Sequence, residues 1–168
     1  DDAQMGFLMG TAFAIFYAVV GIAMGRIADA LQRTRVMAVG LAIWSAMTAF
    51  GGMSSSFAML GAARMGVGIG ESTATPCGQA LIAEYFPPKK RATALSINMT
   101  GSFIGTAGAM IIGGLFLEHW DSWCGGIGAC GVKSWQAALF AVGLPGLPLA
   151  LVVWWLREPG VSGSDLPA

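Results

Sequence analysis

The chain has 168 residues, of which 55% are hydrophobic and only 11% are charged, and its formal net charge is zero. A soluble globular domain carries about a quarter charged residues, so this composition excludes a water-covered fold and makes lipid the expected solvent. The zero net charge offers no basic surface for nucleic acid. The three cysteines form neither a CxxC pair nor a zinc-type spacing, and we expect no metal and no cofactor.

Five apolar segments are long enough to cross a bilayer as helices, which takes about 20 residues each. In chain order they are Ala3–Ile27, Val36–Ser54, Phe57–Tyr85, Ala92–Leu117 and Trp135–Leu156. A spanning backbone must satisfy its own hydrogen bonds, which favours helices, and the short alternating segments of a membrane barrel are missing from the sequence. The predicted fold class is an all-α membrane protein with five transmembrane helices.

The basic residues predict how these segments are oriented. Seven of the nine Lys and Arg residues lie in the first connection, in the third connection and after the last segment. These places share one side of the membrane if every segment spans it, and Lys133 alone falls in a connection on the other side. Lys and Arg are enriched on the cytoplasmic side. We therefore expect a cytoplasmic C-terminus and an external N-terminus.

The third segment carries two ionisable residues at membrane depth. Glu71 lies near its centre, and Arg64 lies seven residues earlier, on the same helical face and about 10 Å away along the axis. An ionisable group at such depth is costly unless it faces protein, water or a partner charge. Burial favours a neutral carboxyl and a nearby cation favours an ionised one, so this pair is suited to proton exchange.

The same face continues with Gly68, Thr75 and Gln79, while Pro76 removes a backbone hydrogen bond just beyond Glu71. We interpret this face as the wall of a central cavity for substrate and protons. The alternative is an ion-pair and hydrogen-bond network that only holds helices together. Because both charges lie at membrane depth on one face, we favour the functional interpretation.

The fourth segment is rich in small residues. Gly101, Gly105 and Gly108 have the spacing that allows another helix to approach closely, so we expect helix packing there. Asn98 and Thr100 lie on the same segment and could face a cavity or bond across helices, and the sequence does not decide between these two roles.

The external connection after the fourth segment holds Cys124 and Cys130 in a glycine-rich stretch. Oxidation is possible outside the membrane, and we expect a small disulfide loop, with two free thiols as the alternative. Cys77, at mid-membrane, is expected to be a packing residue, and His119 is expected to lie at the membrane interface.

The stretch "GRIADALQRTR" resembles the loop signature of the major facilitator superfamily. That signature has a glycine and an aspartate one turn apart, here Gly25 and Asp29, followed by basic residues, here Arg33 and Arg35. The family's next positions differ, since Ala30 stands where a basic residue is usual. The resemblance implies that this loop latches one conformation of a transporter. The alternative is a plain basic loop on the cytoplasmic side.

Three further stretches resemble the fourth, fifth and sixth helices of the same superfamily, in the family's order. "RMGVGIG" places Arg64, Gly68 and Gly70 in the pattern of the fourth helix, where the glycines serve helix packing. "GSFIGTAGAMIIGG" is similar to the fifth helix, although Ala109 replaces the proline of the antiporter form. "WQAALFAVGLPGLPLALVVWWLREP" is similar to the sixth helix.

Within the superfamily, "GIGESTATPCGQALIAEYFPPKKRATALSI" resembles the spinster-type branch, in which a glutamate directly follows the glycine pair. The resemblance implies that Arg64 and Glu71 belong to the central cavity. It also implies that the chain covers helices two to six of an N-terminal six-helix bundle, as the start "DDAQMGF" also indicates. The first helix and the C-terminal bundle would then be missing partners of the same protein.

The expected function is secondary active transport of a small organic or amphiphilic, and in one interpretation anionic, solute across the inner membrane of a bacterium. We expect the proton as the coupling ion and the lipid bilayer as the surroundings. An enzyme is not expected, because the sequence shows no nucleophile–base pair and no phosphate-binding loop. The alternative is a non-transporting, receptor-like or assembly protein with the same fold.

Overall fold

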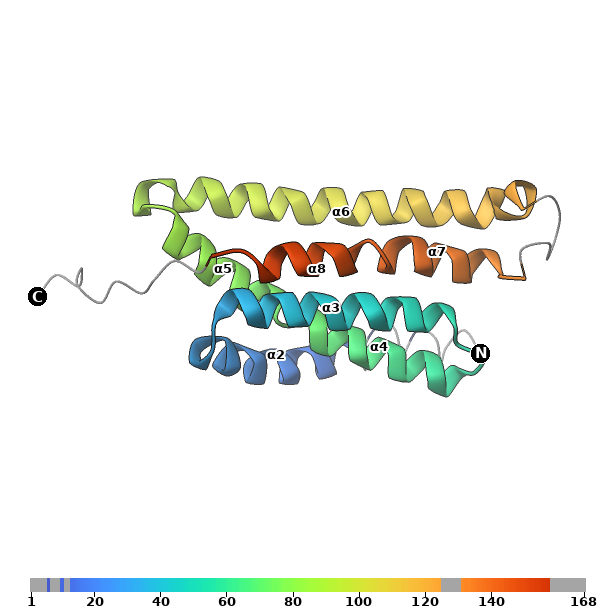
Figure 1. Ribbon diagram of the computed structural model, residues 1–168, viewed down its shortest axis with the longest axis horizontal. Helices are drawn as coiled ribbons and strands as arrows, with labels where there is room; N and C mark the ends of the chain where they lie inside the picture. Colours follow the sequence, from blue (N-terminus) through green and yellow to red (C-terminus); the bar gives the residue numbers. More distant parts are fainter. Residues whose placement is uncertain (1–5, 7–9, 11–12, 125–130, 158–168) are drawn as a thin grey trace, which may run out of the picture.

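The computed structural model describes residues 6, 10, 13–124 and 131–157, and all of its regular elements are helices. The helices lie side by side along a common direction (Figure 1), which confirms the predicted all-α membrane bundle. Their bounds are α2 Phe13–Ala30, α3 Arg33–Gly52, α4 Phe57–Glu71, α5 Ala74–Tyr85, α6 Pro88–Trp123, α7 Ser134–Gly143 and α8 Gly146–Trp154.

The core of the bundle is built around α3, which contacts α2, α4, α5, α7 and α8. The buried positions of α3 are small, among them Ala38, Gly40 and Ser45. The crossing with α4 is so close that a Cβ atom added to Gly70 would lie 2.6 Å from the backbone nitrogen of Trp44. Small residues that let backbones approach are the usual means of packing helices in lipid, and Gly68 and Gly70 are buried as such residues should be.

The third predicted segment, Phe57–Tyr85, is two helices, α4 and α5, and not one continuous helix. The break falls ahead of Pro76, at Ser72 and Thr73, whose hydroxyls donate to the carbonyls of Ile69 (2.8 Å) and Gly70 (2.7 Å). Pro76 then lies in the first turn of α5, where its missing N–H costs little. The side-chain hydrogen bonds satisfy carbonyls at the end of α4.

The last predicted segment is divided in a similar way, into α7 and α8 on either side of Leu144 and Pro145. Taken together, Ser134–Trp154 is long and apolar enough to cross a membrane, as are α3 and α6. Apolar residues 14–28 of α2 form a shorter stretch of the same character.

Helix α6 is the longest element, with 36 residues, and it extends beyond the predicted Ala92–Leu117 at both ends. Pro88 occupies its first turn, a position that proline favours. At about 54 Å it exceeds the roughly 30 Å hydrocarbon core of a bilayer. The helix contacts α5 and α7, yet none of its residues is buried.

The glycines of α6 do not pack as the sequence analysis expected. A Cβ atom added to Gly101 or Gly105 would meet nothing within 4 Å. These two positions face away from α5 and α7, the described helices that contact α6. The spacing allows a close approach, but the described bundle supplies no helix to make it.

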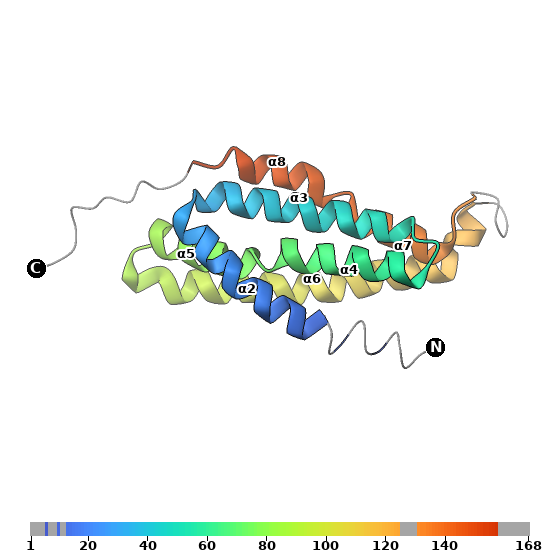
Figure 2. The same ribbon diagram turned by 90° about the horizontal axis from the view of Figure 1, so that it is seen from below.

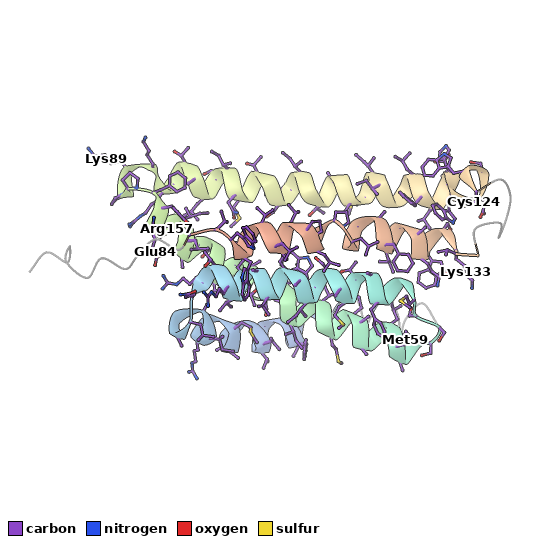
Figure 3. The ribbon with its side chains drawn as sticks, viewed as in Figure 1. Met59, Glu84, Lys89, Cys124, Lys133 and Arg157 are labelled. Carbon is purple, nitrogen blue, oxygen red and sulfur yellow. The ribbon has the colours of Figure 1, made fainter. Side chains whose placement is uncertain are left out.

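The basic residues gather at one end of the bundle. Lys89 and Arg157 lie there beside Glu84, whereas Lys133, Cys124 and Met59 lie at the opposite end (Figure 3). The connection from α2 to α3, the turn from α5 to α6 and the end of α8 share that first end (Figure 1). We call it the cationic end; its basic residues are Arg26, Arg33, Arg35, Lys89, Lys90, Arg91 and Arg157.

Candidate functional site

The two ionisable residues of the third segment both lie on α4. Ser56 begins this helix by accepting a hydrogen bond from the Met59 backbone N–H (3.2 Å). Arg64 is half-buried, and its Nε atom is shielded from solvent by protein. Glu71 is the last residue of α4, directly before the break, and it is exposed in the described bundle.

Arg64 and Glu71 lie on the same helix, and the positive charge of Arg64 acts on the Glu71 carboxyl. The protein around Glu71 also desolvates its carboxyl in part, although the residue as a whole is exposed. The exposure of Glu71 leaves one side of its side chain uncovered. The described helices therefore cover one side of the Glu71 side chain and leave its other side open.

Thr75 and Gln79 extend this open side along α5. Both are exposed, and they stand opposite the buried Cys77 and Leu81 on the helix. We call Arg64, Glu71, Thr75 and Gln79 the polar face. Exposed polar groups at membrane depth are costly against lipid, so this face needs water or further protein to cover it.

A second set of charged residues, an ion pair, joins α3 to α5 at the cationic end. Arg33, the first residue of α3, forms an ion pair with Glu84 near the end of α5, and the two side chains are only 23% and 25% exposed. Tyr85 donates a hydrogen bond to the Arg157 carbonyl after α8. The guanidinium of Arg35 lies over the Trp154 ring, 5.6 Å from its centroid.

Of the predicted latch residues, Arg33 and Arg35 have the partners just described. The backbone of Asp29 belongs to the last turn of α2, but its side chain lies outside the described residues, so its contact with Arg33 or Arg35 stays a prediction. Gly25 lies in the same helix with open space around it. The sequence analysis did not single out Glu84. The signal for it was a carboxylate at the end of an apolar segment, directly before a basic stretch.

Two polar residues of α6 have different surroundings. Asn98 lines a cavity of about 560 Å³ between α5 and α6, together with Ile82 and Phe86. Thr100 donates its hydroxyl to the Ser96 carbonyl (2.9 Å) within the same helix, so its hydrogen bond is local.

The cysteines and His119 complete the sequence-predicted residues. Cys77 is a free, fully buried thiol, as expected of a packing residue. Cys124, at the end of α6, is disulfide-bonded, but Cys130 lies outside the described residues, so the pairing of the two stays a prediction. His119 stacks on Trp123 with ring centroids 5.8 Å apart. Within the described ranges, no three His, Cys, Asp or Glu side chains come together as a metal site.

The helical bundle defines an all-α membrane protein, with three helical stretches among the described residues that are long and apolar enough to cross a bilayer. The profile of the Major Facilitator Superfamily matches residues 1–168, and the chain belongs to this family. It is similar to the "MFS-type efflux pump" of Mycolicibacterium smegmatis, with 34% identity over 95% of this chain and 40% of the pump. It is also 28% identical to "Protein spinster" of Drosophila melanogaster, over 69% of this chain and 19% of that protein.

Among solved structures, the chain resembles a bacterial homologue of the human lysosomal transporter spinster in an inward-facing, unoccupied conformation. The TM-score is 0.81 with 35% identity, and the match covers 100% of this chain and 38% of that structure. The spinster-like resemblance predicted from the sequence is thereby confirmed. The chain spans about 40% of the length of the pump and 38% of the solved homologue.

Proposed function

We propose that the chain is part of a secondary active transporter that moves a small organic or amphiphilic solute by alternating access and couples this movement to protons. The observation that carries the proposal is the polar face, in which Glu71, Thr75 and Gln79 are exposed and Arg64 is half-buried within an otherwise apolar segment. Relatives named as an efflux pump and as a transporter homologue support the same activity.

In this proposal Glu71 is the proton-binding group and Arg64 is the fixed charge beside it. A carboxylate closed off from water is stabilised by taking up a proton, and one reached by water or a cation stays ionised. The two conformations of the transporter then bind the proton with different affinity, so a proton gradient shifts their equilibrium. Arg64 would hold an anionic group of the solute, or a neighbouring carboxylate when no solute is bound.

Thr75 and Gln79 supply neutral hydrogen-bonding groups one and two turns beyond Glu71, along the open side of α5. Such groups orient a solute without adding charge to the cavity. The break at Ser72 and Thr73 lies between the charged and the neutral parts of the face. A break at this place would let α5 change its angle to α4 while the α3–α4 crossing stays fixed.

We also propose that the cationic end is the cytoplasmic side and carries a conformational latch, made of Gly25, Asp29, Arg33 and Arg35, to which the structure adds Glu84. The excess of basic residues supports this orientation. The setting in this proposal is the inner membrane of a bacterium. The remaining partners are the lipid bilayer and the other bundle of the same protein, and no cofactor other than the coupled proton takes part.

The test uses the complete protein in proteoliposomes with two fluorescent probes, NBD-taurine as a small organic anion and an NBD-labelled alkylphosphocholine as an amphiphile. We expect a pH gradient to drive accumulation of at least one of them. Glu71→Gln, which mimics the neutral carboxyl, should abolish this accumulation and leave downhill exchange.

The matched control is Glu118→Gln on α6, an exposed carboxylate away from the polar face, and it should behave as the unaltered protein. Concentrative, pH-dependent uptake that survives Glu71→Gln would place the proton site elsewhere. A folded protein that moves neither probe and releases no protons with any solute would favour the non-transporting alternative.

A further inference from the structure

An apolar groove away from the polar face opens between α2 and α3. The two helices diverge from their short connection at the cationic end (Figure 2), and α2 crosses towards α4 and α5. The space between them has a volume of about 400 Å³. Its walls include Ile27, Leu31, Val36 and Val39, and its base is formed by Ile69 and Thr73.

The dimensions of this groove fit one leaflet of a bilayer. Its lining on α3 runs from Gln32 at the start of the helix to Ile43. Eleven residues of helix span about 16 Å, and half of the hydrocarbon core is about 15 Å thick. The groove therefore begins at the membrane interface and ends near the bilayer centre, which is the depth that an acyl chain reaches.

The groove is open to the surroundings of the bundle. Leu31 and Val39, on its two walls, are 62% and 47% exposed, and Ile27 is 38% exposed. The described helices cover these side chains only in part. In lipid such a surface is in contact with acyl chains, so the remaining question is which lipid it selects.

The mouth of the groove has a definite charge. Arg35 and Gln32 line it at the cationic end, and the Arg35 guanidinium is placed over the ring of Trp154, which also lines the groove. A tryptophan at the interface with an arginine on its face fixes a cation at the level of the lipid head groups. Basic pockets at this level between membrane helices bind anionic head groups.

We propose that the groove between α2 and α3 is a binding site for an anionic phospholipid, with one acyl chain between the two helices and the phosphate against Arg35. The site is distinct from the polar face, whose Thr75 and Gln79 lie on the exposed side of α5, and it does not depend on the solute that the protein moves. The lipid would fill the space where α2 and α3 diverge and so support the angle between them.

A zwitterionic phospholipid fits the groove less well than an anionic one. Its phosphate charge is offset by its own ammonium group, so it gains less from Arg35 and from the other basic residues of the cationic end. A bare head group without a tail also fits poorly, because it makes no contact with the apolar walls. These differences make the proposal testable through both the head group and the chain.

The experiment measures lipids retained by the complete protein after release from nanodiscs made of equal parts POPG and POPC, using native mass spectrometry. We expect bound POPG in clear excess over POPC. Arg35→Gln should lower the POPG excess about fivefold, because one basic residue at an anionic membrane surface contributes about that much to binding. Val39→Phe, which fills the groove, should lower retention of both lipids.

Two matched variants serve as controls. Arg26→Gln removes another exposed arginine of the cationic end that does not line the groove, and Val19→Phe enlarges an exposed valine of α2 outside it. Both should retain lipid as the unaltered protein does. A size-exclusion profile and a thermal melt of each variant establish that it is folded before its lipids are counted.

Three results would overturn the proposal. The first is equal retention of POPG and POPC, or a POPG excess that survives Arg35→Gln. The second is displacement of POPG by millimolar glycerol 1-phosphate, which would reduce the site to a head-group contact. The third is a complete protein that retains no phospholipid while Val39→Phe lowers its melting temperature, which would show that another part of the protein covers the groove.

Discussion

Helices α3 and α6 are both long, unbroken and apolar enough to cross a membrane, but the bundle holds them in opposite ways. Five helices contact α3, and its backbone comes so close to α4 and α7 that glycine is required at Gly70 and Gly143. A Cβ atom added to Gly143 would lie 2.9 Å from the Ala49 backbone nitrogen. In contrast, α6 has no buried residue, and its glycines face open space.

The difference teaches that glycine spacing alone does not locate a helix interface. The fourth predicted segment shows the small-residue spacing plainly at Gly101 and Gly105, yet α6 is the less packed of the two helices. At the α3–α4 crossing the critical glycines, Gly40 and Gly70, lie on different helices, and their importance comes from the backbone that each one faces. Three experiments would break or sharpen this comparison.

The largest effect is expected at the α3–α4 crossing. In Gly70→Ala the new methyl group would lie 2.6 Å from the Trp44 backbone nitrogen, so the helices must move apart. Overpacking of this kind costs about 1–3 kcal/mol. Unfolding of the complete protein by SDS, followed by tryptophan fluorescence, should show this loss of stability.

The control for that change is Gly21→Ala on α2, where nothing lies within 4 Å. It should be neutral or slightly stabilising, because alanine is the better helix former by about 1 kcal/mol. Equal losses in both variants would mean that the close crossing is not what limits stability.

An intermediate effect is expected at the ion pair between Arg33 and Glu84, which ties α5 to the start of α3. A double-mutant cycle with Arg33→Gln and Glu84→Gln should give a coupling of about 1 kcal/mol, reduced by the partial exposure of both side chains. In the transport assay Glu84→Gln should change the rate of movement while the probe still binds.

The control for the ion pair is Lys89→Gln at the start of α6, where the lysine is exposed, and its stability should equal that of the unaltered protein. A coupling energy of zero together with unchanged transport would remove Arg33 and Glu84 from the proposed latch.

The smallest effect is expected for Gly105→Ala on α6. With no described atom near the new methyl group, only the helix preference changes, and a gain of at most about 1 kcal/mol follows. If the complete protein instead loses as much stability as in Gly70→Ala, another of its helices packs on α6. The expected role of Gly101 and Gly105 would then be right for the complete protein.

Composition and apolar runs were enough to predict the membrane bundle, because lipid allows few ways to satisfy a backbone. The gathering of basic residues at one end followed from the same count of segments. Arg64 and Glu71 stood out because an ionisable residue is rare at membrane depth. The motifs then predicted a family that the comparisons confirmed.

Several features were decided only by the tertiary structure. The break at Ser72 and Thr73, rather than at Pro76, depends on two hydroxyls that turn back to carbonyls of the preceding turn. The pairing of Arg33 with Glu84 joins residues 51 positions apart in the sequence. The groove between α2 and α3 exists because the two helices diverge. Local sequence fixes which segments become helices, but contacts between distant residues depend on how those helices are placed against one another.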